Sequence, residues 1–415
     1  MARTHVARVL FGSALVALLA QPAWRSHADA VTDWNVIALN ATEVPPNAIL
    51  QSRVLAIVHG AVYDAVRAVD RKSSAYAVDL GAPADTSVDA AVAAAAHGVL
   101  VRLAPAQRAM VDAALDAALA RIADGRSKTE GIRLGSQIAE KIVALRSADK
   151  SDVQIVFTPK PGAGLYQLTP PHSMAAILPH WGGVTPFVLR SRSGLEFKGP
   201  PGITSAEFAR DFDEVKSVGA RSSRTRTADQ TAAAIFWTVQ TGVPWFAAAR
   251  AASAEKRLSV SENARLFAVL SMATADSQIV GFEEKYKRLH WRPITAIRAA
   301  AGLGIPTLEG DPSWEPLLVT PPQPDYPSAH AIFSGAAESV LRAFFGGDDV
   351  NVSVTFPAPF GVRRTYRKFS EMAEEVDNAR VWGGIHFRSA DKDGSDIGRK
   401  IGTIVVRDFP KPATN

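Results

Sequence analysis

The chain has 415 residues, of which 47% are hydrophobic, and it carries a formal net charge of +5 without any cysteine. Without cysteine, disulfides, thiol chemistry and iron–sulfur clusters are excluded, so stability must come from a large buried core. Because the 46 basic residues form no dense block, nucleic acid is not an expected partner, whereas a small anion is compatible with the charge.

The first thirty residues have the pattern of a bacterial secretory signal. Arg3 and Arg8 precede an apolar run from Val9 to Ala20, and Ala28–Ala30 resembles a cleavage site. The run is shorter than the roughly 20 residues needed to cross a bilayer, and no later stretch of that length lacks charge. We therefore expect residues 1–30 to be removed and the protein to be exported, periplasmic or secreted, without a transmembrane segment.

Apolar residues recur at three- and four-residue steps along most of the remaining chain, which indicates amphipathic helices. The expected helices cover residues 47–69, 86–103, 105–123, 127–147, 205–218, 227–240, 261–291, 328–345, 367–382 and 393–408. Strands are scarce, with 351–356 as the best candidate. The predicted fold class is therefore mainly α, as a multi-helix bundle.

One domain is expected over residues 31–415, because the chain contains no flexible linker, low-complexity tract or repeat. In that domain, residues 31–203 form a helical scaffold plus a long loop region, and residues 204–415 form a second helical part. Residues 150–203 are rich in proline and glycine with little periodicity, so they are expected to form a long loop region that covers part of the molecule.

Lys285 and Arg292 are seven residues apart on a segment with helical periodicity. At 100° per residue they differ by about 20° around a helix and by about 10.5 Å along it, so both could reach one anion. The planar guanidinium of an arginine suits paired contacts to an oxyanion. Pro293 predicts that the helix ends near Trp291–Arg292. Taken alone, such a pair is more often two solvated charges.

Ser328 follows a proline and precedes a clean apolar-periodic helix, which is where an N-cap serine belongs. The unpaired amides of a first helical turn attract anions, and Ala329 is small enough to leave the main chain approachable. His330 would project from that turn with a titratable ring nitrogen. An ordinary N-cap beside a surface histidine has the same sequence pattern.

Arg380 and His386 are six residues apart and would point about 120° away from each other on a continuous helix. The Gly383–Gly384 pair supplies the break that lets both side chains face one site. Taken alone, an interhelical turn has the same pattern. Together, the three clusters supply three cations, a hydroxyl and two histidines, which predicts a site for a tetrahedral oxyanion such as phosphate or vanadate.

These clusters resemble the signature of the vanadium-dependent haloperoxidases and of the related type 2 phosphatidic-acid phosphatase (PAP2, acid phosphatase) superfamily. The stretches Asn263–Ala268, Trp291–Pro293 and Tyr326–Ala331 resemble the haloperoxidase branch in particular. The resemblance covers about residues 205–400 and implies a helical bundle of that type, with residues 204–415 as its catalytic part.

The resemblance also implies roles for single residues. Five of them are expected to bind the oxygens of vanadate, or of phosphate in its place, namely Lys285, Arg292, Ser328, Ala329 and Arg380. His386 is expected to be the axial ligand of vanadate, and His330 the residue that transfers protons. Lys285 is also expected to polarise bound peroxide.

The implied activity is oxidation of halide by hydrogen peroxide to hypohalous acid, which halogenates an organic acceptor, with vanadate as cofactor and neither haem nor flavin. The alternative is a periplasmic acid phosphatase that forms a phosphohistidine at His386 in the same site. A third possibility is a helical protein that only binds phosphate or a partner, although binding alone does not need paired histidines. A homodimer is compatible with the resemblance.

Four positions depart from the family pattern. Ala329 stands where glycine is usual, and Asp391 lies one position later than the aspartate of many phosphatases, which favours the peroxidase branch. Gln323 stands where family peroxidases tend to carry an aromatic ring or histidine near the halide path. Gln240 stands where a carboxylate partner of a histidine is expected, and its loss would lower the pKa of His330 and weaken the activity.

Overall fold

The computed structural model describes residues 29–43, 47–238, 241–355 and 361–411. Within these ranges the protein is mainly α-helical, which confirms the predicted fold class. The α-helices are α1 (Ala30–Ala41), α2 (Ala48–Asp70), α3 (Val88–Leu103), α4 (Arg108–Leu119), α5 (Arg126–Arg146), α6 (Ala206–Val218), α7 (Ala228–Phe236), α8 (Gly242–Lys256), α9 (Val260–Arg288), α10 (Pro293–Ala299), α11 (Ala329–Phe345), α12 (Phe369–Trp382) and α13 (Arg388–Asp408). Short 3-10 turns are η1 (Pro105–Gln107), η2 (Trp181–Gly183) and η3 (Ala300–Gly302).

Most predicted helices agree with these bounds to within a few residues, but three helices are absent from the prediction. These are α1, which follows the expected signal sequence, α8, which is buried on several sides and so has no clear polar face, and α10, which has only 7 residues. Residues 1–28, on which the expected signal sequence largely falls, lie outside the described ranges.

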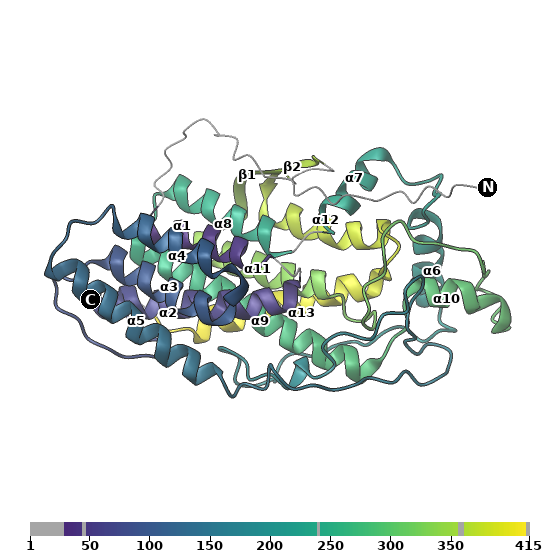
Figure 1. The fold of residues 1–415 in the computed structure, drawn as a ribbon. Helices are drawn as coiled ribbons and strands as arrows, with labels where there is room; N and C mark the ends of the chain where they lie inside the picture. The colour runs from purple at the N-terminus through teal and green to yellow at the C-terminus, as the bar shows by residue number, and fades with distance from the viewer. Residues whose placement is uncertain (1–28, 44–46, 239–240, 356–360, 412–415) are drawn as a thin grey trace, which may run out of the picture.

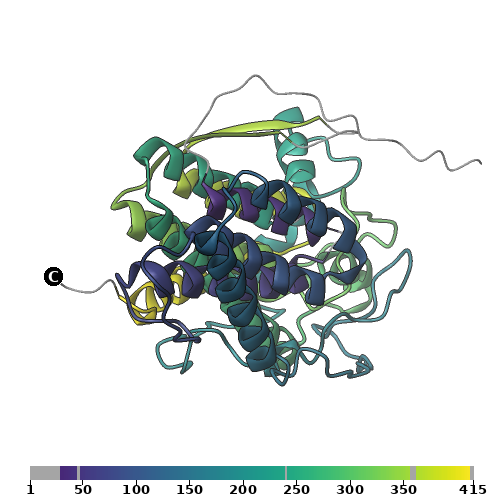
Figure 2. The same ribbon diagram turned by 60° about the vertical axis from the view of Figure 1, so that its left-hand side comes forward.

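The predicted strand at 351–356 is found as β1 (Asp349–Thr355), and residue 356 lies outside the described residues. It pairs antiparallel with β2 (Arg363–Lys368), which the sequence pattern hides because its residues are mostly charged and only Tyr366 is buried. The prediction of a helix from residue 367 therefore starts too early. Figure 2 shows this two-stranded ribbon along the outer edge of the helical bundle.

Helix α9 is the centre of the fold. It begins with a capping box formed by Ser259 and Glu262, and it is buried on nearly every side for most of its 29 residues. Helices α2, α11 and α13 pack against it, and one apolar core extends from α1 to the end of α13. In Figure 1, α1–α5 lie at one end of the bundle and α6, α7 and α10 at the other, with α9 and α11–α13 between them.

The long segment 150–203 has no α-helix, as predicted, and it is tied to α9 and to the chain that follows α9. The carboxylate of Asp276, fully buried on α9, accepts hydrogen bonds of 2.6–2.9 Å from the amides of 187–189. Tyr166 donates its amide to the carbonyl of Leu289 at 2.7 Å, and Trp291 donates to Gly164 at 3.0 Å. The loop therefore braces the stretch that leads to Arg292.

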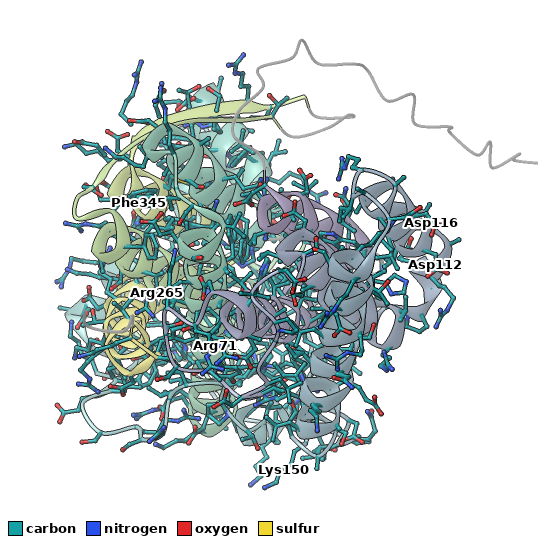
Figure 3. All side chains as sticks on the ribbon, turned by 90° about the vertical axis from the view of Figure 1, so that its left-hand side faces the viewer. Arg71, Asp112, Asp116, Lys150, Arg265 and Phe345 are labelled. Carbon is teal, nitrogen blue, oxygen red and sulfur yellow. The ribbon has the colours of Figure 1, made fainter. Side chains whose placement is uncertain are left out.

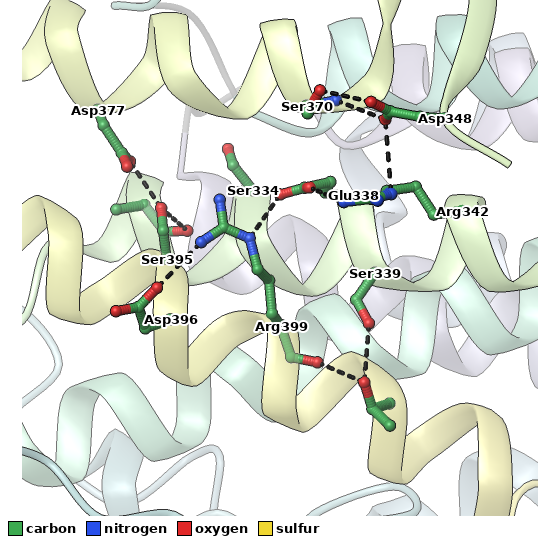
Figure 4. Close-up of polar contacts among 12 residues, drawn as sticks. Ser334, Glu338, Ser339, Arg342, Asp348, Ser370, Asp377, Ser395, Asp396 and Arg399 are labelled. Atoms are coloured by element: carbon green, nitrogen blue, oxygen red, sulfur yellow. Dashed lines mark hydrogen bonds and ion pairs between the residues drawn. The ribbon is translucent and has the colours of Figure 1, made fainter.

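Polar contacts join α11, α12 and α13 (Figure 4). Glu338 of α11, 1% exposed, accepts from Arg342 at 2.9 Å and from Arg399 of α13 at 2.8 Å. Ser395 of α13 donates to Asp377 of α12 at 2.7 Å. These contacts fix the register of the helices whose ends carry the second and third clusters of the sequence.

Among the described helices, α2 has the length and hydropathy of a membrane span, as does the bent pair Val88–Leu103 and Pro105–Leu119 if taken as one segment. In α2, 83% of the apolar window is buried inside the fold, as in a core helix. The outer surface of the bundle carries polar side chains, for example Asp112 and Asp116 on the outer side of α4 in Figure 3.

Candidate active site

Lys285 and Arg292 lie on two different helices. Helix α9 ends at Arg288, Leu289 adopts a left-handed conformation with φ 54°, and Arg292 is the N-cap residue of α10. The predicted continuous helix face is therefore wrong, because the chain turns before Arg292. Both side chains are nevertheless fully buried and belong to one electrostatic cluster, which with Arg380 we term the cation cluster.

The ammonium group of Lys285 donates to the main-chain carbonyl oxygens of Pro324 at 2.8 Å and Asp325 at 3.0 Å. A lysine has three N–H donors, so one remains after these two bonds. Burial, together with the nearby charge of Arg292, lowers the pKa of Lys285 well below its usual value. An anion beside it would offset both effects.

Arg292 is held by main-chain oxygens and by a histidine. Its Nε donates to the carbonyl of Gln323 at 2.7 Å, and its Nη1 to the carbonyl of Ile385 at 2.6 Å and to Nε2 of His386 at 2.9 Å. Its Nη2 is buried and has no hydrogen-bond partner among the described residues. A buried guanidinium N–H without an acceptor is rare in folded proteins, which marks this atom as a candidate ligand contact.

Arg380, in the last turn of α12, has a similar free donor. Its Nη1 donates to the carbonyl of Trp237 at 2.8 Å, while its buried Nε finds no acceptor in the described part of the chain. The side chain is 2% exposed, and burial lowers the pKa of Arg380 to about 10. Two buried arginines therefore each present an unused N–H, which suits an oxyanion.

The predicted break between Arg380 and His386 is present. Helix α12 ends at Trp382, and Gly384 has φ 74°, a conformation that favours glycine. A Cβ atom on Gly384 would lie 2.3 Å from the carbonyl oxygen of Gly219, so a larger residue would clash with the main chain. The turn brings His386 back toward Arg292.

Ser328 is the N-cap residue of α11, as predicted, with its Oγ 3.5 Å from the amide of Ala331. Its own amide donates to the carbonyl of Ala390 at 3.0 Å, which ties the start of α11 to α13. The carbonyl of Ala329 accepts a bond of 2.9 Å from Gln278 of α9. The amides of this first turn therefore have a fixed direction and no helical partners of their own.

Two aspartates complete the buried polar site, and neither is among the predicted site residues. Asp325 is fully buried, with Oδ1 2.9 Å from Nδ1 of His386 and Oδ2 3.5 Å from Nδ1 of His290. Burial acts to raise the pKa of Asp325, but His386, His290 and Arg292 outweigh it and hold that pKa below its usual range. The sequence signal for Asp325 was its position three residues before Ser328.

His386 and Asp391 are both shifted toward their neutral forms. Burial, then the charge of Arg292, lowers the pKa of His386 well below its usual value. Burial, then the charge of Asp377, raises the pKa of Asp391 well above the ordinary range of an aspartate. Asp325 is therefore the carboxylate that remains ionised, with Nη1 of Arg292 3.8 Å from its Oδ1, and an oxyanion would balance the remaining positive charge of the cation cluster.

Comparisons with known proteins agree with the motifs. A family model described as the VCPO second helical-bundle domain matches residues 265–413. The vanadium chloroperoxidase of Curvularia inaequalis is 26% identical over an alignment of 266 residues that covers 51% of this chain. The chain spans only 43% of the length of that relative.

Solved structures extend the likeness to almost the whole chain. A bacterial vanadium-dependent iodoperoxidase matches with a TM-score of 0.80 and 25% identity, over 93% of this chain and 97% of that one. The resemblance to the vanadium haloperoxidases is confirmed. A holo-type bacterial vanadium-dependent chloroperoxidase has the same fold as this chain, with a TM-score of 0.71 at 16% identity, over 89% of this chain and 93% of that one.

The residues of this haloperoxidase-like chain fit vanadate. The free N–H groups of Arg292 and Arg380 are donors to oxygen, and Nε2 of His386 is an acceptor nitrogen directed at the cation cluster. An acceptor nitrogen is what a metal-centred oxyanion needs as a ligand. Family-level likeness to vanadium enzymes and the chemistry of the donor set therefore agree on the cofactor class.

His330 lines a cavity of about 520 Å³ beside the haloperoxidase-like site, together with Arg380 and Ile385. The cavity is mainly apolar, with two side chains that carry nitrogen donors at its wall, and its lining residues are Ile235, Thr238, Leu317, Leu318, Val319, Pro321, His330, Arg380 and Ile385. Val319 is 63% exposed, so the cavity reaches the surface. The cavity therefore gives solutes a path toward His330 and Arg380, and His386 is not among its lining residues.

Of the two glutamines that depart from the family pattern, the structure describes Gln323 and not Gln240. Gln323 is 6% exposed, its carbonyl accepts from Arg292, and it is absent from the lining of the cavity. Gln240 lies outside the described residues, so its expected effect on His330 stays a prediction. The carboxylate that the structure does provide, Asp325, contacts the other histidine, His386.

Proposed function

We propose that the protein is a vanadate-dependent haloperoxidase that uses hydrogen peroxide to oxidise halide to hypohalous acid or its equivalent, and so halogenates organic acceptors. The observation that carries this proposal is the pair of buried, unused N–H donors of Arg292 and Arg380, together with the contact of Arg292 to the acceptor nitrogen of His386. Bound vanadate would supply the Lewis-acidic centre that activates peroxide toward halide without changing its oxidation state.

Each residue of the chain has a separate task in this proposal. Lys285, Arg292 and Arg380 neutralise the oxyanion, and Ser328 and the amide of Ala329 donate further hydrogen bonds at the start of α11. The burial of these groups excludes water, which strengthens each electrostatic contact.

The two histidines divide ligation from proton transfer. His386, kept neutral by burial and by Arg292, has a lone pair on Nε2 that accepts from Arg292 in this structure and would bind the oxyanion once the ligand accepts that N–H instead. His330, at the wall of the apolar cavity, holds or releases a proton on its ring where peroxide and halide would enter. The cavity also supports an apolar organic acceptor near the oxidised halide.

A second candidate, phosphomonoester hydrolysis, is favoured by the contact between Asp325 and His386. A carboxylate at Nδ1 makes Nε2 of a histidine a better nucleophile, which suits a phosphohistidine intermediate. The same cations would bind the phosphoryl oxygens, and His330 would protonate the leaving group.

One experiment separates the candidates. Purified protein is assayed with and without added orthovanadate for peroxide-dependent oxidation of iodide and bromide, and in parallel for hydrolysis of p-nitrophenyl phosphate. Oxidation that depends on vanadate supports the haloperoxidase, whereas hydrolysis inhibited by vanadate supports the phosphatase and contradicts the first proposal. His386→Ala should abolish either activity, and His97→Ala, a histidine-to-alanine change on α3 where the ring contacts Asp112, should leave it intact.

We also propose that the protein is exported, with a mature chain that keeps Asp29. Asp29 caps α1 through a bond of 2.9 Å from the amide of Thr32, and it accepts a bond of 2.8 Å from Asn263. Cleavage after Ala28 preserves both contacts, whereas cleavage after Ala30 removes them. Intact mass measurement of protein from the periplasm or medium distinguishes the two sites, and unprocessed protein in the cytoplasm would contradict export.

A further inference from the structure

Asp325 lies where three parts of the site meet. Its amide donates to the carbonyl of His290 at 2.9 Å, and its carbonyl accepts from Lys285 at 3.0 Å. Its carboxylate is 2.9 Å from Nδ1 of His386 and 3.5 Å from Nδ1 of His290. The main chain of Asp325 is therefore fixed from both sides, so its carboxylate has a defined direction.

The contacts of His386 determine which ring nitrogen carries the proton. An arginine can only donate, so the bond of 2.9 Å from Nη1 of Arg292 requires Nε2 of His386 to accept. A neutral imidazole has one donor and one acceptor nitrogen, so the proton must lie on Nδ1. Nδ1 faces Oδ1 of Asp325, and a carboxylate only accepts.

Neither Nδ1 of His386 nor Oδ1 of Asp325 has an aligned hydrogen-bond partner in the described structure. The two atoms are nevertheless 2.9 Å apart, which is within hydrogen-bonding distance. Catalytic hydrogen bonds are often poorly aligned without a ligand and tighten when it binds. In this buried position, Nδ1–H of His386 is thus the nearest donor for Oδ1 of Asp325, and Oδ1 is the nearest acceptor for Nδ1–H.

We propose that Asp325 is a positioning residue that holds His386 in the Nδ1–H tautomer and so keeps a lone pair on Nε2. That lone pair accepts from Arg292 in this structure, and it becomes available to the oxyanion when the ligand accepts the N–H of Arg292 instead. This inference rests on the proposed function, because it takes His386 as the residue that contacts the oxyanion. It applies to vanadate and to a phosphoryl group alike, since both need the same lone pair. Removal of the acceptor would make the Nε2–H tautomer available, and that tautomer presents a proton to the ligand in place of the lone pair.

The first test measures the tautomer in the unaltered protein. Histidine labelled with ¹⁵N is incorporated, and the ring signals of His386 are identified by their loss in His386→Ala. Nδ1–H with an unprotonated Nε2, both in the free protein and with inorganic phosphate, is the expected result. A wild-type Nε2–H signal would overturn the proposal whether or not any Asp325 variant folds.

The second test measures binding in Asp325→Asn, which keeps the size of the side chain and removes the charge. Loss of such a supporting contact typically weakens ligand affinity about 10–100-fold, and we expect this loss for orthovanadate and for inorganic phosphate by calorimetry. The ¹⁵N spectrum of His386 should then show a mixture of tautomers. Wild-type affinity together with an unchanged spectrum would overturn the proposal.

Asp64→Asn is the matched control. Asp64 is also fully buried and accepts three main-chain amides at 2.7–3.0 Å, but it lies on α2, outside the site. This variant should lose stability while keeping the affinity of the folded protein and the tautomer of His386. Equal loss of affinity in Asp64→Asn would mean that Asp325 acts only through general stability, and would overturn the positioning role.

The two levels of inference fail in different ways. A protein with neither peroxidase nor phosphatase activity, but with the expected tautomer and weaker phosphate binding in Asp325→Asn, would contradict the proposed function and leave the positioning role intact. An active protein whose His386 tautomer and anion affinity are unchanged in Asp325→Asn would support the proposed function and contradict the positioning role.

Discussion

Arg292 donates from Nη1 to Nε2 of His386 at 2.9 Å, while its neighbouring Nη2 is buried without an acceptor among the described residues. One guanidinium thus orients the histidine and retains a second donor for a ligand. A lysine has neither the planar fork nor the reach to do both.

Arg292→Lys should therefore weaken binding of orthovanadate although the charge is kept. Hydrogen bonds to charged groups contribute about 1.5–3 kcal/mol, which corresponds to a loss of affinity of about 10–150-fold. Calorimetric titration measures the change. Arg298→Lys is the control on the same helix, because Arg298 is partly exposed and contacts the carbonyl of Trp314 and Glu315. Equal affinity of Arg292→Lys and wild type would contradict the assigned contact.

Inorganic phosphate should stabilise the folded protein, because it offsets the repulsion within the cation cluster. A ligand at 100 times its Kd raises the free energy of unfolding by about 2.7 kcal/mol. We expect that rise in wild type by denaturant unfolding, and its loss at the same phosphate concentration in Arg380→Leu. Without phosphate, Arg380→Leu removes one of three clustered cations, so its own stability must be measured as the reference. An undiminished rise in this variant would place the anion elsewhere.

The parts of the site that could be predicted from sequence are those set by short-range rules. Ser328 is an N-cap because a proline precedes it and a periodic helix follows, and the structure has it there. The turn at Gly383–Gly384 follows from the conformational freedom of glycine, and Gly384 does have a positive φ. Motif order then relates these local features to a known family.

The parts that could not be predicted depend on contacts between distant segments. The left-handed residue Leu289 separates Lys285 from Arg292, although the apolar pattern continues through it. The contact of Asp325 with His386 joins two segments that no periodicity relates, and a carboxylate in an oxyanion site runs against simple charge rules. In this buried site the carboxylate is instead stabilising, because the basic side chains of Lys285, Arg292 and Arg380 are shielded from water and need a counter-charge.

Close contact between α11 and α13 holds the second and third clusters together, and it depends on glycine. A Cβ atom on Gly398 of α13 would lie 2.2 Å from the carbonyl oxygen of Ile332 on α11. Gly398→Ala should lower the free energy of unfolding by about 1–3 kcal/mol or more, because main-chain atoms must separate. Gly302→Ala is the control, since a Cβ there meets no atom within 4 Å. Similar stability of the two variants in urea unfolding would contradict this packing.

His59 should make the protein sensitive to acid, because its surroundings accept only the neutral ring. The side-chain oxygen of Asn35 accepts from Arg250, so the Asn35 amide nitrogen must donate to Nε2 of His59 at 2.9 Å. The ring is fully buried and stacks on Phe246 and Phe267. Protonation of Nε2 would place its N–H against the N–H of the Asn35 amide, so that two donors face each other without an acceptor. Burial, with a smaller effect of Arg250, lowers the pKa of His59 to about 3.

The resulting pH dependence has a definite sign. An unfolded histidine titrates near 6.5, so between that pH and about 3 the unfolded chain binds a proton that folded His59 does not. The contribution of His59 to stability is therefore complete above pH 6.5, and up to about 5 kcal/mol is lost as the pH falls through this window. His59→Gln, which keeps an acceptor for Asn35, should remove that part of the loss, so the difference in unfolding free energy between wild type and variant changes steadily from pH 7 to pH 4.

His97→Gln, at a partly exposed site, serves as the control. Parallel urea-unfolding curves for wild type and His59→Gln across this range would show that His59 becomes charged inside the fold, contrary to the geometry around it.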